Sequence, residues 1–453
     1  MRRRVINGMT GEVDWSKEVL SFKAKTNTTF TVKYSNGGTG ELQYSLDNGK
    51  TWTVVTHDGN NNINSFVTPT VSAGKYIQWK GNLACPGNTG TTGLVFWSSG
   101  SYDVCGNILS LIDETLTEPA SLPSACFAKL FDKSVLGSSI NNAVKNAENL
   151  ILPSVISTYC YDHMFYGCTS LETAPLILPA LTAPNYCYQY MFCGCTYLYN
   201  PPIEIVATSY GVGSCQYMFY NCTRVTYYTK VNATTITTKS CYYMFYRNGY
   251  GWSTGTNRPE LSAPPYLPAT TMASQCYQHI FEGCAHITNI YNVLPASLTI
   301  PSSANNCCAE MFYGCKKLVD GGITLAPNGM SQSCFNEFFR ECTSLTIPPI
   351  LPNTTLGTYC YKSMFFGCTK LVNGPILPAL TLTQQCYAAM FNGCTKLANI
   401  KMMATNISAT DCLSNWMSGV GSTGTFTKNA AATWNVTGAS GVPTGWTVQT
   451  ATS

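Results

Sequence analysis

From Cys160 to Leu171 the chain reads Cys-Tyr-Asp-His-Met-Phe-Tyr-Gly-Cys-Thr-Ser-Leu, and close copies start at Cys360 (CYKSMFFGCTKL) and Cys386 (CYAAMFNGCTKL). The leading cysteine occurs eleven times with a basic period of about 26 residues, at Cys126, Cys160, Cys187, Cys215, Cys241, Cys276, Cys307, Cys334, Cys360, Cys386 and Cys412. Periods of roughly 20 to 50 residues are typical of solenoids, in which each unit stacks on its neighbours. The repeat therefore predicts a solenoid.

Apolar residues in each unit stand at the first cysteine and four, eight and eleven positions later, with a second stripe one and five positions after it. This spacing predicts two turns of helix, ended by a glycine seven positions after the first cysteine, as at Gly167 and Gly367. An extended stretch follows and often carries a Leu-Pro-Ala turn, as at Leu178-Pro179-Ala180, where the proline stops any helix. The predicted fold class is an α/β repeat solenoid with one short helix and one short strand per unit.

Nineteen of the 23 cysteines occupy repeat positions: eleven of them lead a unit, seven stand eight residues later, and Cys222 stands seven residues after Cys215. In a helix these two positions lie about 12 Å apart, whereas a disulfide needs Cα atoms within about 7 Å. We therefore predict buried, reduced columns of small soft side chains, represented by Cys160, Cys168, Cys187, Cys195, Cys276, Cys284, Cys360, Cys368, Cys386 and Cys394. Four cysteines lie outside the pattern and cannot be paired from the sequence: Cys85, Cys105, Cys193 and Cys308.

The unit starting at Tyr159, Tyr-Cys-Tyr-x-x-Met-Phe-x-Gly-Cys-Thr-x-Leu-x-x-x-Pro, resembles the BspA-like leucine-rich repeat. That family has Ile-Gly-x-x-Ala-Phe-x-x-Cys-x-x-Leu followed by Ile-Pro, so cysteine here replaces its glycine and methionine replaces its alanine. The resemblance covers about residues 126 to 420, and this Cys-Tyr-x-x-Met-Phe-x-Gly-Cys type is similar to proteins of gut Bacteroidetes and their phages. It implies a right-handed solenoid of leucine-rich-repeat type, used for adhesion and protein contacts, without a catalytic residue.

The regions that flank the repeat have different patterns. Residues 1–115 contain alternating segments such as 29–34 and 75–79 with Asn-Gly turns between them, which predict an immunoglobulin-like β-sandwich that acts as an anchor. No capping role is evident for this region in the sequence. We expect the solenoid to span 116–420 and a strand-rich C-terminal cap to span 421–453.

Charge, hydropathy and motifs argue against several kinds of function. A net charge of +4 without clustered Lys or Arg beyond residues 2–4 argues against nucleic-acid binding, and the chain has no apolar stretch of membrane-spanning length. Cys276-x-x-His279 and Cys284-x-His286 have zinc-like spacing, but both cysteines are ordinary repeat positions, so we predict no metal and no cofactor.

One further motif, Ser45-x-Asp47-x-Gly49-x-x-Trp52, resembles the Asp-box hairpin of sialidases. In a single copy it is better explained as a capped turn, and no pair of carboxylates suited to glycosidase chemistry stands out. We predict that the chain is not an enzyme.

An insertion of nine residues over the basic period follows Cys241 and contains Tyr250, Trp252 and Arg258. Insertions in solenoids form surface loops, often on the binding face, and exposed aromatic side chains suit contact with sugar or protein. These three residues are the predicted ligand-binding site, with an idle loop as the alternative.

Three functions remain open. The first is a non-enzymatic bacteriophage virion protein, such as a head or tail fibre, a decoration protein or a receptor-binding protein. The absence of a recognisable signal peptide and the reduced cysteines favour it, since virion proteins fold in the host cytoplasm. The second is a bacterial cell-surface adhesin, and the third is a glycan-active enzyme. Expected partners are other virion proteins or a host surface glycan or protein, and self-association into a homo-oligomer is also open.

Overall fold

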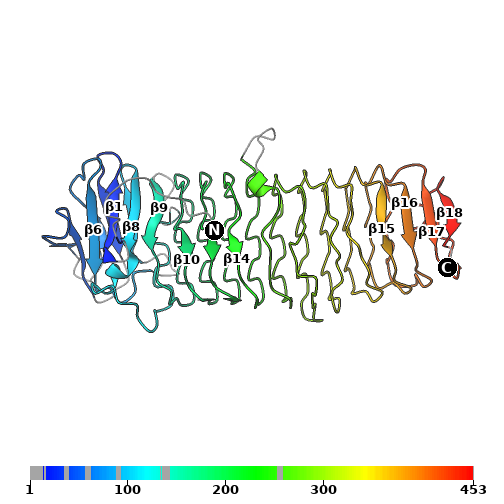
Figure 1. Ribbon diagram of the computed structural model, residues 1–453, viewed down its shortest axis with the longest axis horizontal. Helices are drawn as coiled ribbons and strands as arrows, with labels where there is room; N and C mark the ends of the chain where they lie inside the picture. The colour runs from blue at the N-terminus through cyan, green and yellow to red at the C-terminus, as the bar shows by residue number, and fades with distance from the viewer. Residues whose placement is uncertain are drawn as a thin grey trace.

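The computed structural model describes residues 14, 17–34, 40–56, 63–87, 93–132, 134, 143–251 and 259–451. The chain forms a long rod in which two N-terminal sheets lie at one end, stacked coils form the body, and β18 lies near the other end (Figure 1). Each coil of the rod corresponds to one sequence unit. The repeat therefore predicts that the molecule extends along one axis, with its units in sequence order.

The larger N-terminal sheet has six strands in the order β4-β3-β6-β1-β8-β9. Its strands are antiparallel except for the last pair, β8 and β9, which is parallel. The strands are β1 (Leu20–Ala24), β3 (Leu42–Ser45), β4 (Thr53–Val54), β6 (Tyr76–Gly81), β8 (Tyr102–Asn107) and β9 (Val144–Ile151).

The second sheet is antiparallel, in the order β5-β2-β7, and comprises β2 (Phe30–Tyr34), β5 (Ile63–Val67) and β7 (Val95–Ser98). The two sheets share one core, because the ring of Phe22 on β1 lies 5.4 Å from that of Phe30 and 5.1 Å from that of Phe96. The 3-10 helix η2 (Ile108–Leu111) follows β8, and its four residues are buried.

The N-terminal region also covers the first coil of the solenoid. Strand β9 belongs to the N-terminal sheet and is bridged in parallel to the next coil through Asn146 and Thr173. The ring of Phe96 packs on Phe131 of the first coil at 6.1 Å, and the Phe96 N–H donates to the carbonyl of Leu130 at 2.8 Å. A solenoid end exposes apolar surface, so this region has the capping role that the sequence did not reveal.

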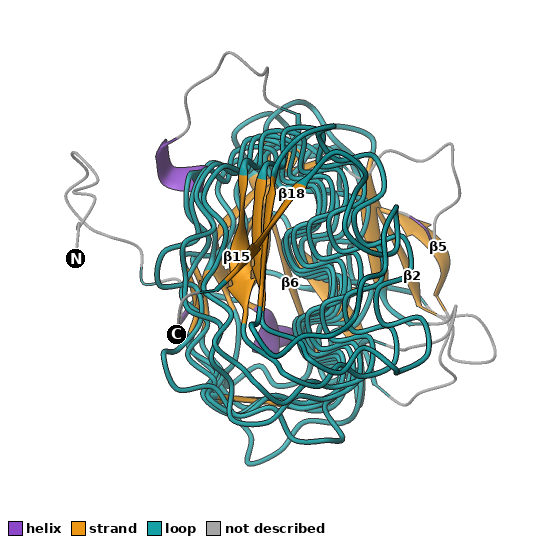
Figure 2. Cartoon of the chain, turned by 90° about the vertical axis from the view of Figure 1, so that its right-hand side faces the viewer, coloured by secondary structure: helices purple, strands orange, loops and turns teal. Residues whose placement is uncertain are grey.

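Parallel pairing between successive coils builds the body of the rod. Figure 2 shows the strands of successive coils lying over one another on one side and turns on the other. Isolated parallel bridges continue the ladder where no strand is long enough to be assigned, as between Thr299 and Asn328. The strands are β10 (Ile177–Leu178), β11 (Thr182–Ala183), β12 (Glu204–Ile205), β13 (Ser209–Tyr210), β14 (Lys230–Val231), β15 (Asn373–Leu377), β16 (Asn399–Met402), β17 (Thr425–Lys428) and β18 (Thr447–Thr450).

The predicted α/β class is wrong, because the molecule is a β-solenoid. No α-helix occurs among the described residues, and helical structure is limited to short 3-10 turns such as η2 and η4 (Pro259–Leu261). Residues 160–167, predicted as a helix, lie in the segment 158–168, a run of overlapping β-turns with i to i+3 hydrogen bonds, such as Met164 N–H to Tyr161 O at 3.1 Å. The alternate N–H groups leave the coil, as Phe165 N–H does when it donates to Met191 O of the next coil at 2.9 Å. We call this segment of each coil the turn ribbon.

The turn ribbon repeats every four residues, and this is why its sequence imitates a helix. Positive φ angles recur at Tyr159, His163 and Gly167, at 59°, 55° and 68°. Two side chains in every four point into the core, so Cys160, Tyr161, Met164, Phe165 and Cys168 are all fully buried. Over nine residues a period of four cannot be distinguished from the helical period of about 3.6. The two backbones differ in the partners of their N–H groups. In a helix these groups donate to carbonyls of the same helix, whereas half of the N–H groups in the turn ribbon donate to a neighbouring coil.

Two adjacent alanines test this backbone. Ala389 has a φ of 51°, whereas Ala388 has no positive φ. We expect Ala389→Gly to stabilise the protein by about 0.5–1 kcal/mol, because relief of left-handed strain of about 1–2 kcal/mol exceeds the added entropy of the unfolded chain. Ala388→Gly should destabilise it by about 0.5–1 kcal/mol or more. Chemical denaturation measures whether each variant is more stable or less stable than the original protein. If both substitutions destabilise the protein, the segment is a helix and not a turn ribbon.

The C-terminal end continues the sheet in the order β15-β16-β17-β18, all parallel. Indole N–H groups of three tryptophans donate to backbone carbonyls at 2.8 Å: Trp416 to Gly441, Trp434 to Ala404 and Trp446 to Gly421. These bonds fasten the last segment to the preceding coils. Among the described residues, no helix has the length and apolar character needed to cross a membrane.

Candidate functional site

The outer face of the turn ribbon carries the side chains that the buried columns leave free. Counted from the leading cysteine, or from Ser214 and Ser240 in the two units whose cysteine stands one residue later, positions 3, 6 and 7 lie on the outer face, while positions 0, 1, 4, 5 and 8 are buried in units such as that of Cys160. Because coils stack in register, equal positions of successive units form columns along the rod. The columns at positions 3 and 6 contain the aromatic groups that we assign as the candidate site.

Five rings at position 3 form a continuous stack, which we call the aromatic ladder: His163, Tyr190, Tyr217, Tyr243 and His279. Successive ring centroids lie 4.6, 4.8, 5.2 and 4.0 Å apart, and the Tyr190–Tyr217 and Tyr217–Tyr243 pairs are within 7° of parallel. Each of these residues has a positive φ near 55°, which directs its side chain away from the core. The result is an ordered surface of ring edges and hydroxyl groups.

Tyrosines at position 6 widen this surface. Tyr220 stacks on Tyr246 with centroids 4.4 Å apart and meets Tyr217 edge-on at 5.5 Å. The guanidinium of Arg247 lies 5.2 Å from the Tyr246 ring centroid and 5.5 Å from that of Tyr250. Tyr250, with 59% of its surface exposed, is therefore linked to Tyr246 through Arg247.

The predicted binding residues are thus only partly placed by the structure. Tyr250 is exposed and contacts the guanidinium of Arg247, while Trp252 and Arg258 lie outside the described residues. Sequence reasoning missed the ladder itself. A signal was present in the sequence, because tyrosine recurs three residues after Cys187, Ser214 and Ser240, which begin three successive units. A helical unit, however, gave no reason to align these tyrosines on one outer face.

Partial burial raises the pKa of several tyrosine hydroxyls on this surface. Desolvation, assisted by neighbouring groups, raises the pKa of Tyr190, Tyr217 and Tyr220 to about 12. The same cause raises the pKa of Tyr243 further. At neutral pH the tyrosines therefore act as hydrogen-bonding, uncharged groups on an apolar body, a combination enriched at protein interfaces.

The structure buries all ten of the named column cysteines, and all 23 cysteines are free thiols. The argument from helix length does not hold, because the helix is absent. The second column has its own role: the thiol of Cys195 donates to the carbonyl of Phe165 on the preceding coil at 3.1 Å, and the same bond recurs at Cys168, Cys222, Cys284, Cys315, Cys342, Cys368 and Cys394 at 3.0 to 3.2 Å. Each thiol thus gives that carbonyl a second donor beside the N–H of its own turn.

The leading column is shifted by one residue in two units. Tyr188 N–H donates to Ser214 O, and Cys215 N–H donates to Ser240 O, each at 2.8 Å. Ser214 and Ser240 therefore stand where other units have the leading cysteine, while Cys215 and Cys241 take the place of the following tyrosine. Asn248 occupies the position of the missing second cysteine and is buried.

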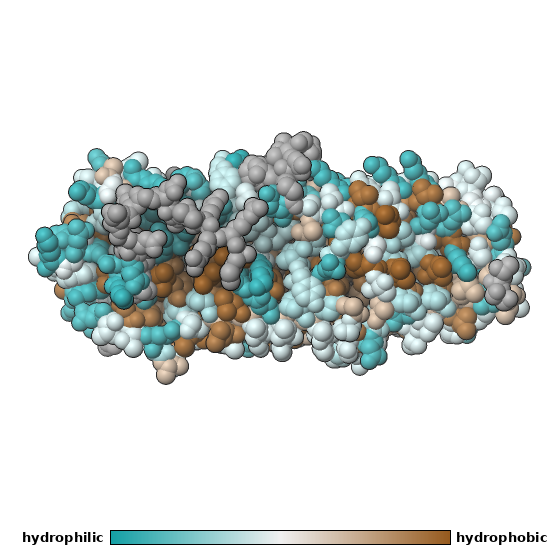
Figure 3. All heavy atoms as spheres, in the orientation of Figure 1, coloured by the Kyte–Doolittle hydropathy of each residue, from teal (hydrophilic) through white to brown (hydrophobic). Residues whose placement is uncertain are grey.

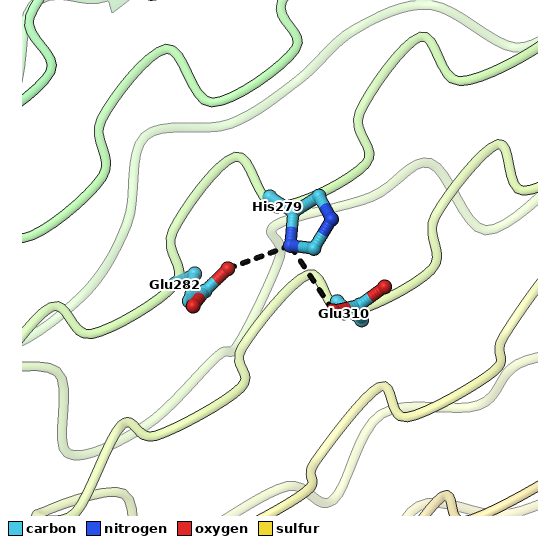
Figure 4. A group of neighbouring side chains, drawn as sticks. All are labelled: His279, Glu282 and Glu310. Atoms are coloured by element: carbon cyan, nitrogen blue, oxygen red, sulfur yellow. Dashed lines mark hydrogen bonds and ion pairs between the residues drawn. The ribbon is translucent and has the colours of Figure 1, made fainter.

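The first of the two motifs with zinc-like spacing separates in the structure. The Cys276 thiol points into the core, where it lies 3.6 Å from Cys307 O, whereas His279 belongs to the outer face. His279 instead meets two carboxylates, with Nδ1 2.6 Å from Glu282 Oε2 and 3.3 Å from Glu310 Oε2 (Figure 4). Desolvation raises the pKa of Glu310, while the imidazole opposes that rise. Among the described residues, this trio is the group suited to hold a metal ion.

The Asp-box motif caps a turn between β3 and β4. Asp47 accepts hydrogen bonds from Ser45 Oγ at 2.8 Å, Thr51 Oγ1 at 2.6 Å and Thr51 N at 2.9 Å. These bonds, those from Thr51 first, lower the pKa of Asp47 to about 2. Trp52 Nε1 donates to Gly49 O at 3.1 Å. The polar groups of the motif are thus engaged within the hairpin.

A second surface lies on the strand side of the rod. Pro264, Pro265 and Pro268 have no N–H group to donate to the strand pairing between coils. A groove of about 680 Å³ opens there beside β14, and its lining includes Glu204, Tyr228, Lys230, Asn232 and Tyr266. Figure 3 shows hydrophobic side chains gathered in two areas of this side. Its exposed apolar residues include Leu176, Leu181, Ile203, Ile347, Ile350, Ile376 and Leu380.

Comparison with known proteins agrees with the repeat. The BspA type leucine-rich repeat region matches residues 134–248 and 277–415 in six copies, more than half of the chain. A leucine-rich repeat protein from Bacteroides ovatus, known from a crystal structure, is 16% identical, with 69% of this chain and 82% of that chain covered and a TM-score of 0.21. Comparison with curated proteins gives no match. The family match confirms the resemblance inferred from the unit, and the chain belongs to the BspA-type leucine-rich repeat family.

Proposed function

We propose that the chain is a non-catalytic adhesion protein that binds a host surface protein or glycan through the aromatic ladder and its flanking tyrosines. The observation that carries the proposal is the ladder, in which stacking holds the tyrosines in one arrangement before any ligand arrives. Rigid, amphipathic rings lose little conformational entropy on binding, which is why tyrosine is prominent in binding surfaces. Repeat families of this kind serve contact, and the Asp-box residues are engaged within their own turn.

The proposal extends to location: the chain is a bacteriophage virion protein, with a bacterial surface adhesin as the alternative. Free thiols throughout the chain support folding in a reducing compartment, which a virion protein meets in the host cytoplasm. The N-terminal sheets then attach to the parent particle and the turn ribbon faces outward. Mass spectrometry of purified virions and of host envelopes distinguishes the two locations.

Loss of ladder rings tests the binding function in the full-length chain. We expect the double variant Tyr217→Ser/Tyr220→Ser to weaken binding to a panel of gut bacterial cells at least about 10-fold, since each ring is a candidate hot spot of about 1 kcal/mol or more. Serine occupies the column of Tyr217 naturally at Ser363, so the backbone there is compatible with it. Titration of labelled protein on cells measures the effect.

Tyr266→Ser is the matched control, because Tyr266 is 51% exposed but lines the groove on the strand side. Binding should be unchanged in this variant. Loss of binding in Tyr266→Ser with retention in the ladder variant would assign adhesion to the groove and refute the ladder.

A further inference from the structure

We propose that His279, Glu282 and Glu310 bind a divalent transition-metal ion, with Zn²⁺ as the best-suited species. Their ligand atoms all lie within 4.8 Å of one another, and Nδ1 of His279 is the central atom of the group (Figure 4). One imidazole nitrogen and two carboxylate oxygens form a ligand set that Zn²⁺ accepts, with a fourth position for water. His279 belongs to both the aromatic ladder and this site, but the metal proposal does not rest on the adhesion proposal, which is carried by the tyrosines.

Stacking of the coils brings the three ligands together. His279 and Glu282 stand at positions 3 and 6 of one unit, and Glu310 stands at position 3 of the next. The backbone sets this spacing, because His279 N–H donates to Ala309 O at 3.0 Å and Glu310 N–H donates to Asn336 O at 2.8 Å. The two residues share a φ near 57°, so their side chains leave the backbone in the same direction.

The imidazole is also held in place before any ion arrives. Tyr243 stacks on it with centroids 4.0 Å apart and planes 11° apart, and the His279 side chain is 8% exposed. A ligand that is already oriented loses little entropy on coordination. Glu282 and Glu310, at 17% and 21% exposure, have room for an ion and for its water.

The balance of charge around the trio favours a cation. Four carboxylates follow one another along this face, at Glu282, Glu310, Glu337 and Glu341. Arg340 is paired with the last two, with nitrogen–oxygen distances of 3.0 Å to Glu337 and 3.9 Å to Glu341. Within the part of the chain that the structure describes, His279 is the basic group that forms ion pairs with Glu282 and Glu310. A bound divalent ion would offset two negative charges that are partly removed from water.

His163 supplies an internal comparison, because it stands at the same position of an earlier coil and contacts one carboxylate, with Nδ1 2.7 Å from Asp162 Oδ1. An imidazole with a single carboxylate is a common hydrogen-bonded pair. The second carboxylate, contributed by the next coil, is what distinguishes the His279 group as a site.

Co²⁺ and Zn²⁺ titrations of the full-length protein at neutral pH test the site. We expect one Co²⁺ per chain, with the visible d–d absorption of a nitrogen and oxygen site and no thiolate charge-transfer band, and its displacement by Zn²⁺. Glu310→Gln and Glu282→Gln should each weaken Zn²⁺ binding at least about 10-fold, while His163→Gln should leave it unchanged. Thermal melting in a chelator establishes that each variant is folded, and either glutamine variant suffices if the other is not.

Three results would overturn the proposal. The first is Zn²⁺ affinity that is unchanged in the folded glutamine variant. The second is a thiolate charge-transfer band, which would place the ion on a cysteine such as the partly exposed Cys85. The third is Ca²⁺ binding as tight as Zn²⁺ binding, which would mean that the imidazole is not a ligand.

Discussion

Raising the pH from about 8 to about 10 is expected to unfold the solenoid under reducing conditions. Burial raises the pKa of repeat thiols such as Cys160, Cys215, Cys284 and Cys394 from an ordinary value of 9.0 to about 12. The unfolded chain therefore releases thiol protons above pH 9 that the folded chain keeps. The thiols contribute full stability below their unfolded pKa, and the contribution is lost as the pH rises toward the folded values.

The expected loss of stability is large because each buried thiol in the columns contributes to it. Each thiol that ionises only in the unfolded chain removes about 1.4 kcal/mol of stability per pH unit. Ten such thiols would remove on the order of 10 kcal/mol by a pH of about 10, comparable to the whole stability of a typical domain of about 5–15 kcal/mol.

Urea unfolding at a series of pH values under reductant measures this loss, and proton release on unfolding measures its cause directly. On the order of ten protons should leave the chain when it unfolds near a pH of about 9.5. A urea midpoint that stays constant from about pH 8 to about pH 10 would mean that the cysteine columns are accessible to solvent in the folded protein.

Removal of one ring from the phenylalanine column is the second large effect. Phe365 is fully buried, with centroids 5.8 Å from Phe339 and 5.4 Å from Phe391 and planes within 10° of each of them. Phe365→Ala is expected to cost about 3–5 kcal/mol, because it leaves a cavity between two coils that are tied by backbone bonds and cannot collapse. Each coil of a solenoid is stabilised mainly by its neighbours. Hydrogen exchange should therefore show a loss of protection centred on the coils that contain Phe339, Phe365 and Phe391.

The adjacent Phe366 is the control for this prediction. It stands on the outer face, where the guanidinium of Arg340 lies 4.4 Å from its ring centroid. Phe366→Ala should therefore cost no more than about 1 kcal/mol. Equal costs for the two variants would contradict the assignment of buried and outer positions in the turn ribbon.

The cysteine columns show how far the sequence reaches. Cys160, Cys168, Cys360 and Cys368 are buried thiols in the structure because a residue that recurs in every unit meets its own copies when units stack. This placement follows from the repeat alone and does not depend on the backbone between the cysteines. It is unaffected by the error in secondary structure.

The backbone of the unit shows where the sequence is insufficient. Met164 and Phe165 fit an amphipathic helix as well as they fit a turn ribbon, since both put neighbouring apolar pairs four residues apart on one face. The distinction lies in the partner of the Phe165 N–H group, which is Met191 on another coil. A window of a single unit contains no information about that partner.

The sequence by itself determined the repeat, its family and its buried positions. The tertiary structure decided the turn ribbon, the covering of the first coil by the N-terminal sheets, the aromatic ladder and the meeting of His279 with Glu310. The physical reason is common to all four. Each depends on groups that are far apart along the chain, such as residues 279 and 310, and only the stacking of whole coils in register brings them within reach of a hydrogen bond or a shared ion.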